Sequence, residues 1–199
     1  SLALAAGFVD ALAFLNLGGY FVSFMSGNST RAGVGLASNL THAAIAFSLI
    51  AAFVSGVAAG SLVSRGVAAT ANARALSLVA GLLIAAGVCV ALNLHVITVG
   101  LMAMAMGASN TTFQREGEVS VGVTYMTGTL VKLGQRLADA LTGGPRFAWA
   151  PYLLLWSGLV GGAALGAFVY PVLGLHAVWI AAATVALIAL DVSRGAPSR

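Results

Sequence analysis

An acidic residue within an apolar stretch is the first feature of this sequence that could carry chemistry. Asp10 has apolar neighbours for a full helical turn on either side. A carboxylate at membrane depth costs several kcal/mol when it is unpaired, so it must face a bundle interior or find a partner. Two interpretations of Asp10 follow. It couples transport to a proton or a cation, or it hydrogen-bonds a neighbouring helix and fixes the packing.

Hydroxyl, glycine and amide residues cluster at two places in the chain. The residues concerned are Ser26, Gly27, Asn28, Thr127, Gly128 and Thr129. Side chains of these types cap free N–H groups at a helix start, and glycine permits close approach of the backbone. A pair of helix starts would offer oriented N–H donors to a polar or anionic ligand. In the alternative interpretation they cap interfacial helices and bind nothing.

A basic residue follows each cluster. Arg31 and Lys132 each lie one helical turn after the first glycine of their cluster. Such a side chain could pair with Asp10 or hold an anionic substrate. Alternatively, it extends to the lipid headgroups, as long basic side chains near helix ends commonly do. We expect Arg31 to be the functional one and Lys132 to lie at the cytoplasmic face.

The composition places these residues in a membrane protein. Hydrophobic residues make up 60% of the 199 residues, charged residues 7%, and the mean hydropathy is +1.00. Residues 32–64, 75–114 and 147–190 contain no Lys, Arg, Asp or Glu. Each stretch is longer than the roughly 20 residues that cross a bilayer, and backbone groups in lipid must bond within their own helix. The sequence therefore predicts an all-α, polytopic bundle.

We expect about six membrane spans with short loops. The predicted spans are 2–22, 43–63, 75–93, 96–113, 149–170 and 172–190. Turn-forming residues at 93–95 and 171–174 divide the two longest apolar stretches into helical hairpins. The segments 24–40 and 124–141 are too polar or too short for ordinary crossings, so we interpret them as re-entrant or interfacial helices.

The basic residues predict the orientation of these spans. When the six spans alternate, eight of the nine basic residues lie on one side of the membrane and Arg31 lies on the other. That side is cytoplasmic by the positive-inside rule. Both termini are therefore predicted to be cytoplasmic.

An internal duplication with a period of about 101 residues divides the single domain, 1–199, into repeats of about 1–95 and 96–199. FMSGNSTRAG at 24–33 aligns without gaps to YMTGTLVKLG at 125–134, and Asp10 corresponds to Asn110. A further match pairs Gly56 and Gly60 with Gly158 and Gly162. Three spans per repeat would make the second repeat insert upside down, the architecture of many secondary transporters.

Four segments carry a resemblance to a known family: GFVDALAFL, FMSGNST, AMGASNTTF and VTYMTGTLVKLGQ. In them, and over nearly its whole length, the chain resembles the YoaK-like family of small bacterial inner-membrane proteins. The resemblance implies a multi-pass protein of the bacterial inner membrane, for which transport is suspected and the substrate is unknown. It supplies no catalytic residues.

The sequence thus predicts a transporter of a small polar or anionic solute, with proton coupling through Asp10. We expect the solute site to comprise Asp10, Asn110, Ser26, Gly27, Asn28, Arg31, Thr127, Gly128 and Thr129. The alternatives are a non-transporting accessory or structural subunit of a larger membrane complex, and a channel. Lipids and a second copy of the chain, as a homodimer, are the expected partners. We expect no enzymatic activity, cofactor, metal site or nucleic-acid binding.

Overall fold

The computed structural model describes residues 2–65, 68–112, 114–115, 118–119 and 124–195. The helices of these residues are α1 (Leu2–Asn16), α2 (Met25–Ser38), α3 (Leu40–Ser64), α4 (Ala68–Ala91), α5 (His95–Ser109), α6 (Met126–Leu141), α7 (Ala150–Leu173) and α8 (Val178–Gly195), with a 3-10 turn, η1 (Gly174–Ala177). Two short strands, β1 (Gln114–Arg115) and β2 (Glu118–Val119), form an antiparallel ladder. Apart from this ladder the described chain is helical, which confirms the predicted helical membrane bundle.

Three helical segments of the described chain are long and apolar enough to cross a membrane, as judged by length and composition. They are Leu40–Ser64, Thr70–Ala91 and the segment Ala150–Arg194, which joins α7, η1 and α8. The apolar helices α1 and α5 have 15 residues each. A helix of that length measures about 22 Å, which is less than the hydrocarbon core of a bilayer. The helix in the first predicted span, 2–22, ends early at Asn16, and the helix in the fourth, 96–113, ends at Ser109.

Both predicted interruptions of the long apolar stretches are present, but the prediction of a hairpin holds only for the first: α4 packs against α5, whereas α7 and α8 do not pack against each other. Asn93 lies between α4 and α5 with a φ of 60°, in the left-handed region that asparagine tolerates better than most residues. Gly174 ends α7 with a φ of 55°. Pro171 lies inside the last turn of α7 and does not end it. The second interruption is therefore set by the glycine and not by the proline.

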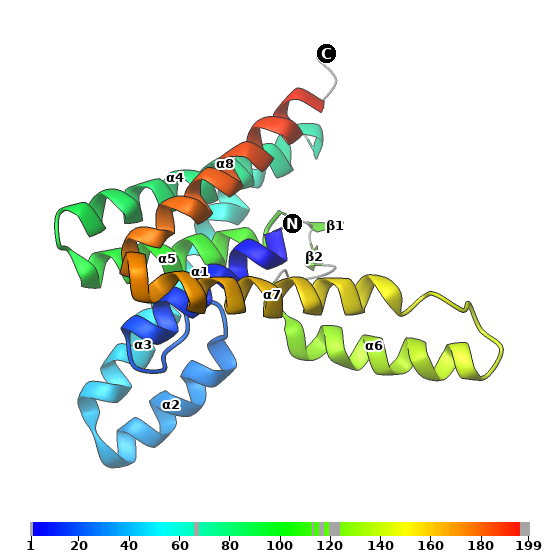
Figure 1. Ribbon diagram of the computed structural model, residues 1–199, viewed down its shortest axis with the longest axis horizontal. Helices are drawn as coiled ribbons and strands as arrows, with labels where there is room; N and C mark the ends of the chain where they lie inside the picture. The colour runs from blue at the N-terminus through cyan, green and yellow to red at the C-terminus, as the bar shows by residue number, and fades with distance from the viewer. Residues whose placement is uncertain (1, 66–67, 113, 116–117, 120–123, 196–199) are drawn as a thin grey trace.

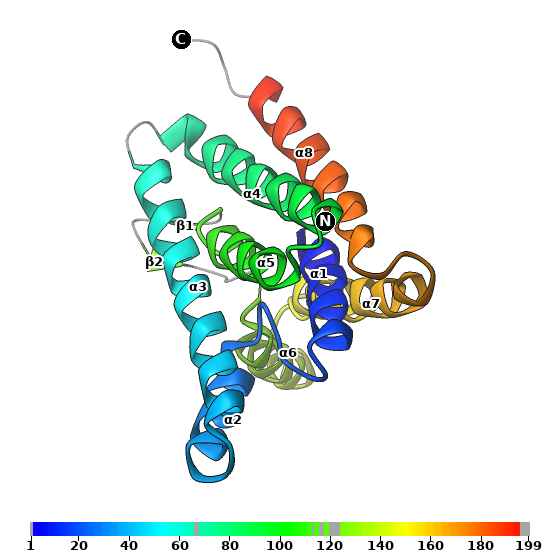
Figure 2. The ribbon, with the colours of Figure 1, turned by 90° about the vertical axis from the view of Figure 1, so that its left-hand side faces the viewer.

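The helices pair across the two halves of the chain. Figure 1 shows α4 and α8 side by side and antiparallel, with α5 next to α4 and α1 next to α7. In Figure 2, α3 runs along the side of the bundle opposite to α8, where it packs against α5 and α2. The pairs α2–α3 and α6–α7 form two arms that extend from this bundle in different directions.

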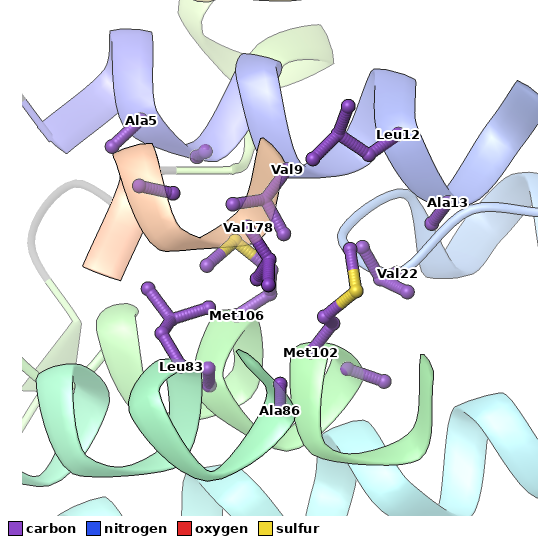
Figure 3. Close-up of a cluster of buried hydrophobic side chains, with 14 of the residues drawn as sticks. Ala5, Val9, Leu12, Ala13, Val22, Leu83, Ala86, Met102, Met106 and Val178 are labelled. Carbon is purple, nitrogen blue, oxygen red and sulfur yellow. The ribbon is translucent and has the colours of Figure 1, made fainter. Parts of the chain in front are cut away.

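The centre of the bundle is formed by side chains from α1, α4, α5 and α8. Figure 3 shows Val9, Leu83, Met102, Met106 and Val178 pointing toward one another, and each is at most 1% exposed. Because lipid is as apolar as these side chains, close packing rather than water exclusion holds them together. The two methionines lie one turn apart on α5 and fill the space between its neighbours.

Glycines bring α7 against α1 and α3 against α5 at backbone distance. A Cβ on Gly162 would overlap the carbonyl group of Leu4, and a Cβ on Gly56 would overlap that of Met104. Small residues at such positions permit the tight helix contacts on which membrane bundles depend. The predicted match of Gly56 with Gly158 is therefore one helical turn out, because Gly162 has the corresponding contact.

The facing helices contribute matching glycines of their own. A Cβ on Gly7 of α1 would overlap the carbonyl of Leu159, and a Cβ on Gly107 of α5 would overlap that of Phe53. Each interface therefore has glycine on both sides. A methyl group added at any of these glycines would displace the backbone of the facing helix.

Adjacent glycines of α7 offer a matched test of this packing. Gly162→Ala should lower the free energy of unfolding by about 1–3 kcal/mol, the usual cost of overpacking. A Cβ on Gly161 would meet nothing within 4 Å, so Gly161→Ala should be neutral or stabilising. Denaturation in detergent, followed by circular dichroism, measures both. Equal unfolding midpoints for the two variants would contradict the α1–α7 contact.

Candidate functional site

The first helix breaks inside the bundle. After α1 ends at Asn16, residues 17–24 are not helical, and α2 begins at Met25. Within this segment Tyr20 is 3% exposed and Val22 is fully buried. Irregular backbone inside a membrane protein is tolerated only where its N–H and C=O groups find partners.

Asp10 is the hydrogen-bond partner of two of these N–H groups. One oxygen of its carboxylate, Oδ1, accepts hydrogen bonds from the backbone N–H groups of Val22 at 2.8 Å and Ser23 at 2.9 Å. The carboxylate thus ties the middle of α1 to the end of the break. This geometry agrees with the second interpretation of Asp10, with the difference that its partner is the broken segment and not another helix.

Asn28 of α2 binds the same break from the other side. Its side chain is fully buried, Oδ1 accepts from the N–H of Phe21 at 3.1 Å, and Nδ2 donates to the Phe21 carbonyl at 2.6 Å. The N–H groups of residues 21 to 23 are therefore all paired with side chains. Side chains thus replace, for these three residues, the hydrogen bonds that a helix would have supplied.

Asn110 has a similar task in the segment between the end of α5 at Ser109 and the start of α6 at Met126, which we call the second break. Its Oδ1 accepts from the N–H of Thr124 at 3.2 Å, and its Nδ2 donates to the Met106 carbonyl at 2.9 Å. Residues 113, 116–117 and 120–123, within this break, lie outside the described residues. The predicted correspondence of Asp10 and Asn110 thus extends to function in the fold, with an amide in place of the carboxylate.

The predicted capping role of the two polar clusters is wrong. The N-cap residues are Phe24 for α2 and Tyr125 for α6, and neither side chain makes a capping hydrogen bond. The hydroxyls of Ser29, Thr30 and Thr129 donate to the carbonyl four residues earlier in their own helix. Hydroxyl side chains within a helix commonly bond in this way, which leaves them unable to cap its start.

The glycines of the clusters make room for an aromatic ring. A Cβ on Gly27 would overlap the ring of Phe24, and a Cβ on Gly128 would overlap the ring of Tyr125. The ring at each helix start therefore folds back over the glycine three residues later. This close approach is to a side chain, whereas the sequence predicted an approach of the backbone.

The two helix starts border one cavity of about 650 Å³. Its lining residues are Ser23, Phe24, Met25, Ser26, Phe53, Val57, Asn110, Thr124, Tyr125, Met126 and Thr127. Both breaks contribute, and α3 contributes Phe53 and Val57. The polar groups among these residues are hydroxyls and one amide, and none is charged.

Three of the predicted site residues line this cavity together, namely Ser26, Asn110 and Thr127. Gly27, Asn28, Gly128 and Thr129 shape the helix starts but do not line it. Sequence reasoning missed Phe53 and Val57. The correct register of the repeated glycines could have indicated them, because both lie within one turn of Gly56.

Asp10 lies beside a second cavity, of about 450 Å³, between α1 and α7. Leu159 and Ala163 line it from α7, in the positions that Phe53 and Val57 occupy on α3. The two cavities are thus related places in the two halves. One borders a carboxylate, and the other borders an amide.

Arg31 and Lys132 do not join either cavity. Asp10 bonds to the backbone of the first break and forms no ion pair with Arg31, so Arg31 does not neutralise Asp10 as considered from the sequence. The guanidinium carbon of Arg31 lies 5.0 Å from the ring centroid of Tyr20. Lys132 is exposed on α6.

These features define a class of helical membrane protein in which two broken helices meet at one cavity. The chain belongs to the family described as "Protein of unknown function (DUF1275)", which matches residues 1–190. It is 32% identical over 183 residues to a UPF0700 transmembrane protein of Rhizobium meliloti (strain 1021), a match that covers 90% of this chain and 78% of the relative. No solved structure matches the chain. The membrane character is thereby supported, while the resemblance to the YoaK-like family stays a prediction.

Two substitutions of Asp10 separate the effect of its hydrogen-bond acceptor from the effect of its charge. Asp10→Leu leaves the N–H groups of Val22 and Ser23 without partners, at a cost of about 1–3 kcal/mol each in the free energy of unfolding. Asp10→Asn keeps an acceptor, as Asn110 does, and should cost about 1 kcal/mol. Denaturation of the purified variants in detergent measures both. An Asp10→Leu variant as stable as Asp10→Asn would show that the carboxylate does not hold the break.

Proposed function

We propose that this protein transports a small polar solute across the bacterial inner membrane, and that the solute binds in the cavity between the two breaks. The single observation that carries the proposal is that residues from both breaks, Ser26 and Thr127 among them, line one cavity. In secondary transporters, discontinuous helices from two repeats commonly form the solute site near the midplane.

The lining of the cavity favours an uncharged solute over an anion. Ser23, Ser26, Asn110, Thr124 and Thr127 offer hydroxyl and amide groups, which donate and accept hydrogen bonds without a net charge. The aromatic and aliphatic residues around them suit the apolar part of a small molecule. A charged solute would lose its hydration in this cavity without gaining a counter-ion.

An inverted arrangement of the repeats is part of the proposal. In Figure 1, α1 and α5 run in opposite directions, as do α4 and α8, which are the corresponding helices of the two halves. The matching glycine contacts of α1 with α7 and of α5 with α3 support the same arrangement. Alternating access would then exchange the roles of the two halves. The distribution of the basic residues supports cytoplasmic termini. We also propose that two copies of the chain form a homodimer.

Proton coupling has a physical route through Asp10. Its ionised carboxylate makes charge-assisted hydrogen bonds to the break, and such bonds are roughly twice as strong as neutral ones. Protonation of Asp10 would therefore loosen the break beside the solute cavity. Asn110 cannot respond to a proton in this way, so the first half is the titrating half.

Filling the cavity tests the location of the solute site. Val57→Trp should reduce solute uptake into proteoliposomes to the level of protein-free vesicles, because the indole ring occupies the cavity. Val54, on the same helix, is 58% exposed, so Val54→Trp should keep full uptake. The probes are labelled glycerol, urea and simple sugars, with labelled organic anions for comparison. Uptake that survives Val57→Trp would contradict the proposed site.

A proton gradient tests the coupling. Uptake by the unaltered protein should rise with an imposed proton gradient, and Asp10→Asn should transport at a rate that no longer depends on it. Gradient dependence that persists in Asp10→Asn would exclude Asp10 as the coupling group. Uptake that ignores the gradient in both proteins would favour a channel over a coupled transporter.

A further inference from the structure

A second polar site lies in the arm formed by α2 and α3, away from the cavity between the breaks. Arg31 of α2 lies over the ring of Tyr20, 5.0 Å from the guanidinium carbon to the ring centroid. The Tyr20 hydroxyl is 2.6 Å from Nδ1 of His42 on α3. Three elements thus bring a cation, a phenol and an imidazole together. Neither interpretation of Arg31 from the sequence included Tyr20 or His42.

The described residues place no acid beside this cation. Asp10 is the single acidic residue among the first 115 residues, and its bonded oxygen is directed at the break. Arg31 makes no ion pair among the described residues. The face of Tyr20 satisfies one side of the guanidinium group, but an aromatic ring accepts none of its N–H groups in the geometry of a carboxylate.

The backbone leaves space for this guanidinium group. Gly19 has a φ of 109°, and a Cβ there would approach Nη2 of Arg31 to 2.8 Å. A glycine therefore suits this position both by its backbone conformation and by the room that it leaves. The position of Arg31 is accordingly built into the break and is not that of a freely extending surface side chain.

A cavity of about 210 Å³ opens beside these groups. It is lined by Tyr20, Thr30, Arg31, Val34, Gly35, Ser38 and His42. The Ser38 and Thr30 hydroxyls donate to carbonyls of α2. The donors left for a ligand are therefore the N–H groups of Arg31 and the second ring nitrogen of His42, which carries the proton when Nδ1 accepts from Tyr20.

We propose that this cavity binds an oxyanion group, a carboxylate or a phosphate, between Arg31 and His42. The planar guanidinium group matches the two oxygens of such a group in a bidentate contact. The volume admits one small anion with a few water molecules, since each water occupies about 30 Å³ in the liquid. The ligand supplies a counter-ion, which no described residue provides for Arg31. This site is independent of the proposed transport function.

An oxyanion group could reach this cavity from either of two sources. A free solute anion could enter from the water, or the phosphate of an anionic lipid could enter from the membrane surface. Inorganic phosphate and acetate probe the first source in detergent solution. Nanodiscs of phosphatidylglycerol, compared with nanodiscs of phosphatidylcholine, probe the second.

Stabilisation of the purified full chain reads out binding, because a ligand that binds only the folded state raises the unfolding temperature. We expect phosphate, acetate or phosphatidylglycerol to raise the unfolding temperature of the unaltered protein more than sodium chloride at equal ionic strength. Arg31→Gln should abolish the rise, and Arg31→Lys should weaken it, because an ammonium group cannot form the bidentate contact. Lys132→Gln is the matched control, since Lys132 is the exposed counterpart in the second repeat.

The measured unfolding temperatures distinguish a free-anion site, a lipid headgroup site and the absence of a site. A rise with phosphate or acetate that Arg31→Gln loses and Lys132→Gln keeps supports a free-anion site. A rise confined to phosphatidylglycerol with the same pattern supports a lipid headgroup. If Arg31→Gln does not fold, Arg31→Lys must still bind more weakly than Lys132→Gln. Equal responses in all the proteins, or an equal effect of chloride, would overturn the proposal.

Discussion

The structure depends on one constraint, which is that a helix broken inside a membrane bundle must find partners for its freed backbone groups. Backbone carbonyls supply some of these partners, and side chains supply the others. Asp10 and Asn28 supply them at the first break, and Asn110 does so at the second. Without these three side chains, the breaks would carry unpaired N–H groups, and a continuous helix would be favoured over a cavity.

The cavity follows from the breaks. Because α1 and α5 stop short, the starts of α2 and α6 meet between the two halves. The glycine contacts place α3 against α5, so that Phe53 and Val57 close one side of this cavity. The halves differ at their breaks, since a carboxylate and an amide hold the first break and one amide holds the second. That difference would let a symmetric scaffold respond to protons in one half only.

Much of this could be predicted from the sequence. Charge-free stretches identified the long helices, and Asn93 and Gly174 marked the turns between them. The alignment of the repeats also paired Asp10 with Asn110, and both side chains accept a hydrogen bond from the backbone of a non-helical segment. These features were accessible because hydropathy and turn chemistry are local properties of the chain. The orientation of the spans in the membrane, by contrast, is still inferred only from the positions of the basic residues.

Other features could not be predicted, for physical reasons. The apolar sequence continues past Asn16 to Val22, so hydropathy cannot reveal that the helix ends where a carboxylate takes over its hydrogen bonds. The glycines of α7 recur every fourth residue, and either of two registers would place small residues on the same face. Only packing against Leu4 selects Gly162. The Arg31 cluster likewise depends on the α2–α3 hairpin.

The most direct test of the account is whether the two breaks meet. In a background with Cys89→Ala, which removes the single cysteine, Ser26→Cys and Thr127→Cys should be joined within one chain by a short bifunctional thiol reagent. A pair of Ser26→Cys with Thr142→Cys, at the far end of α6, should not be joined. Efficient cross-linking of the first pair alone is the predicted result. Failure of that pair, or equal cross-linking of both, would contradict a shared cavity.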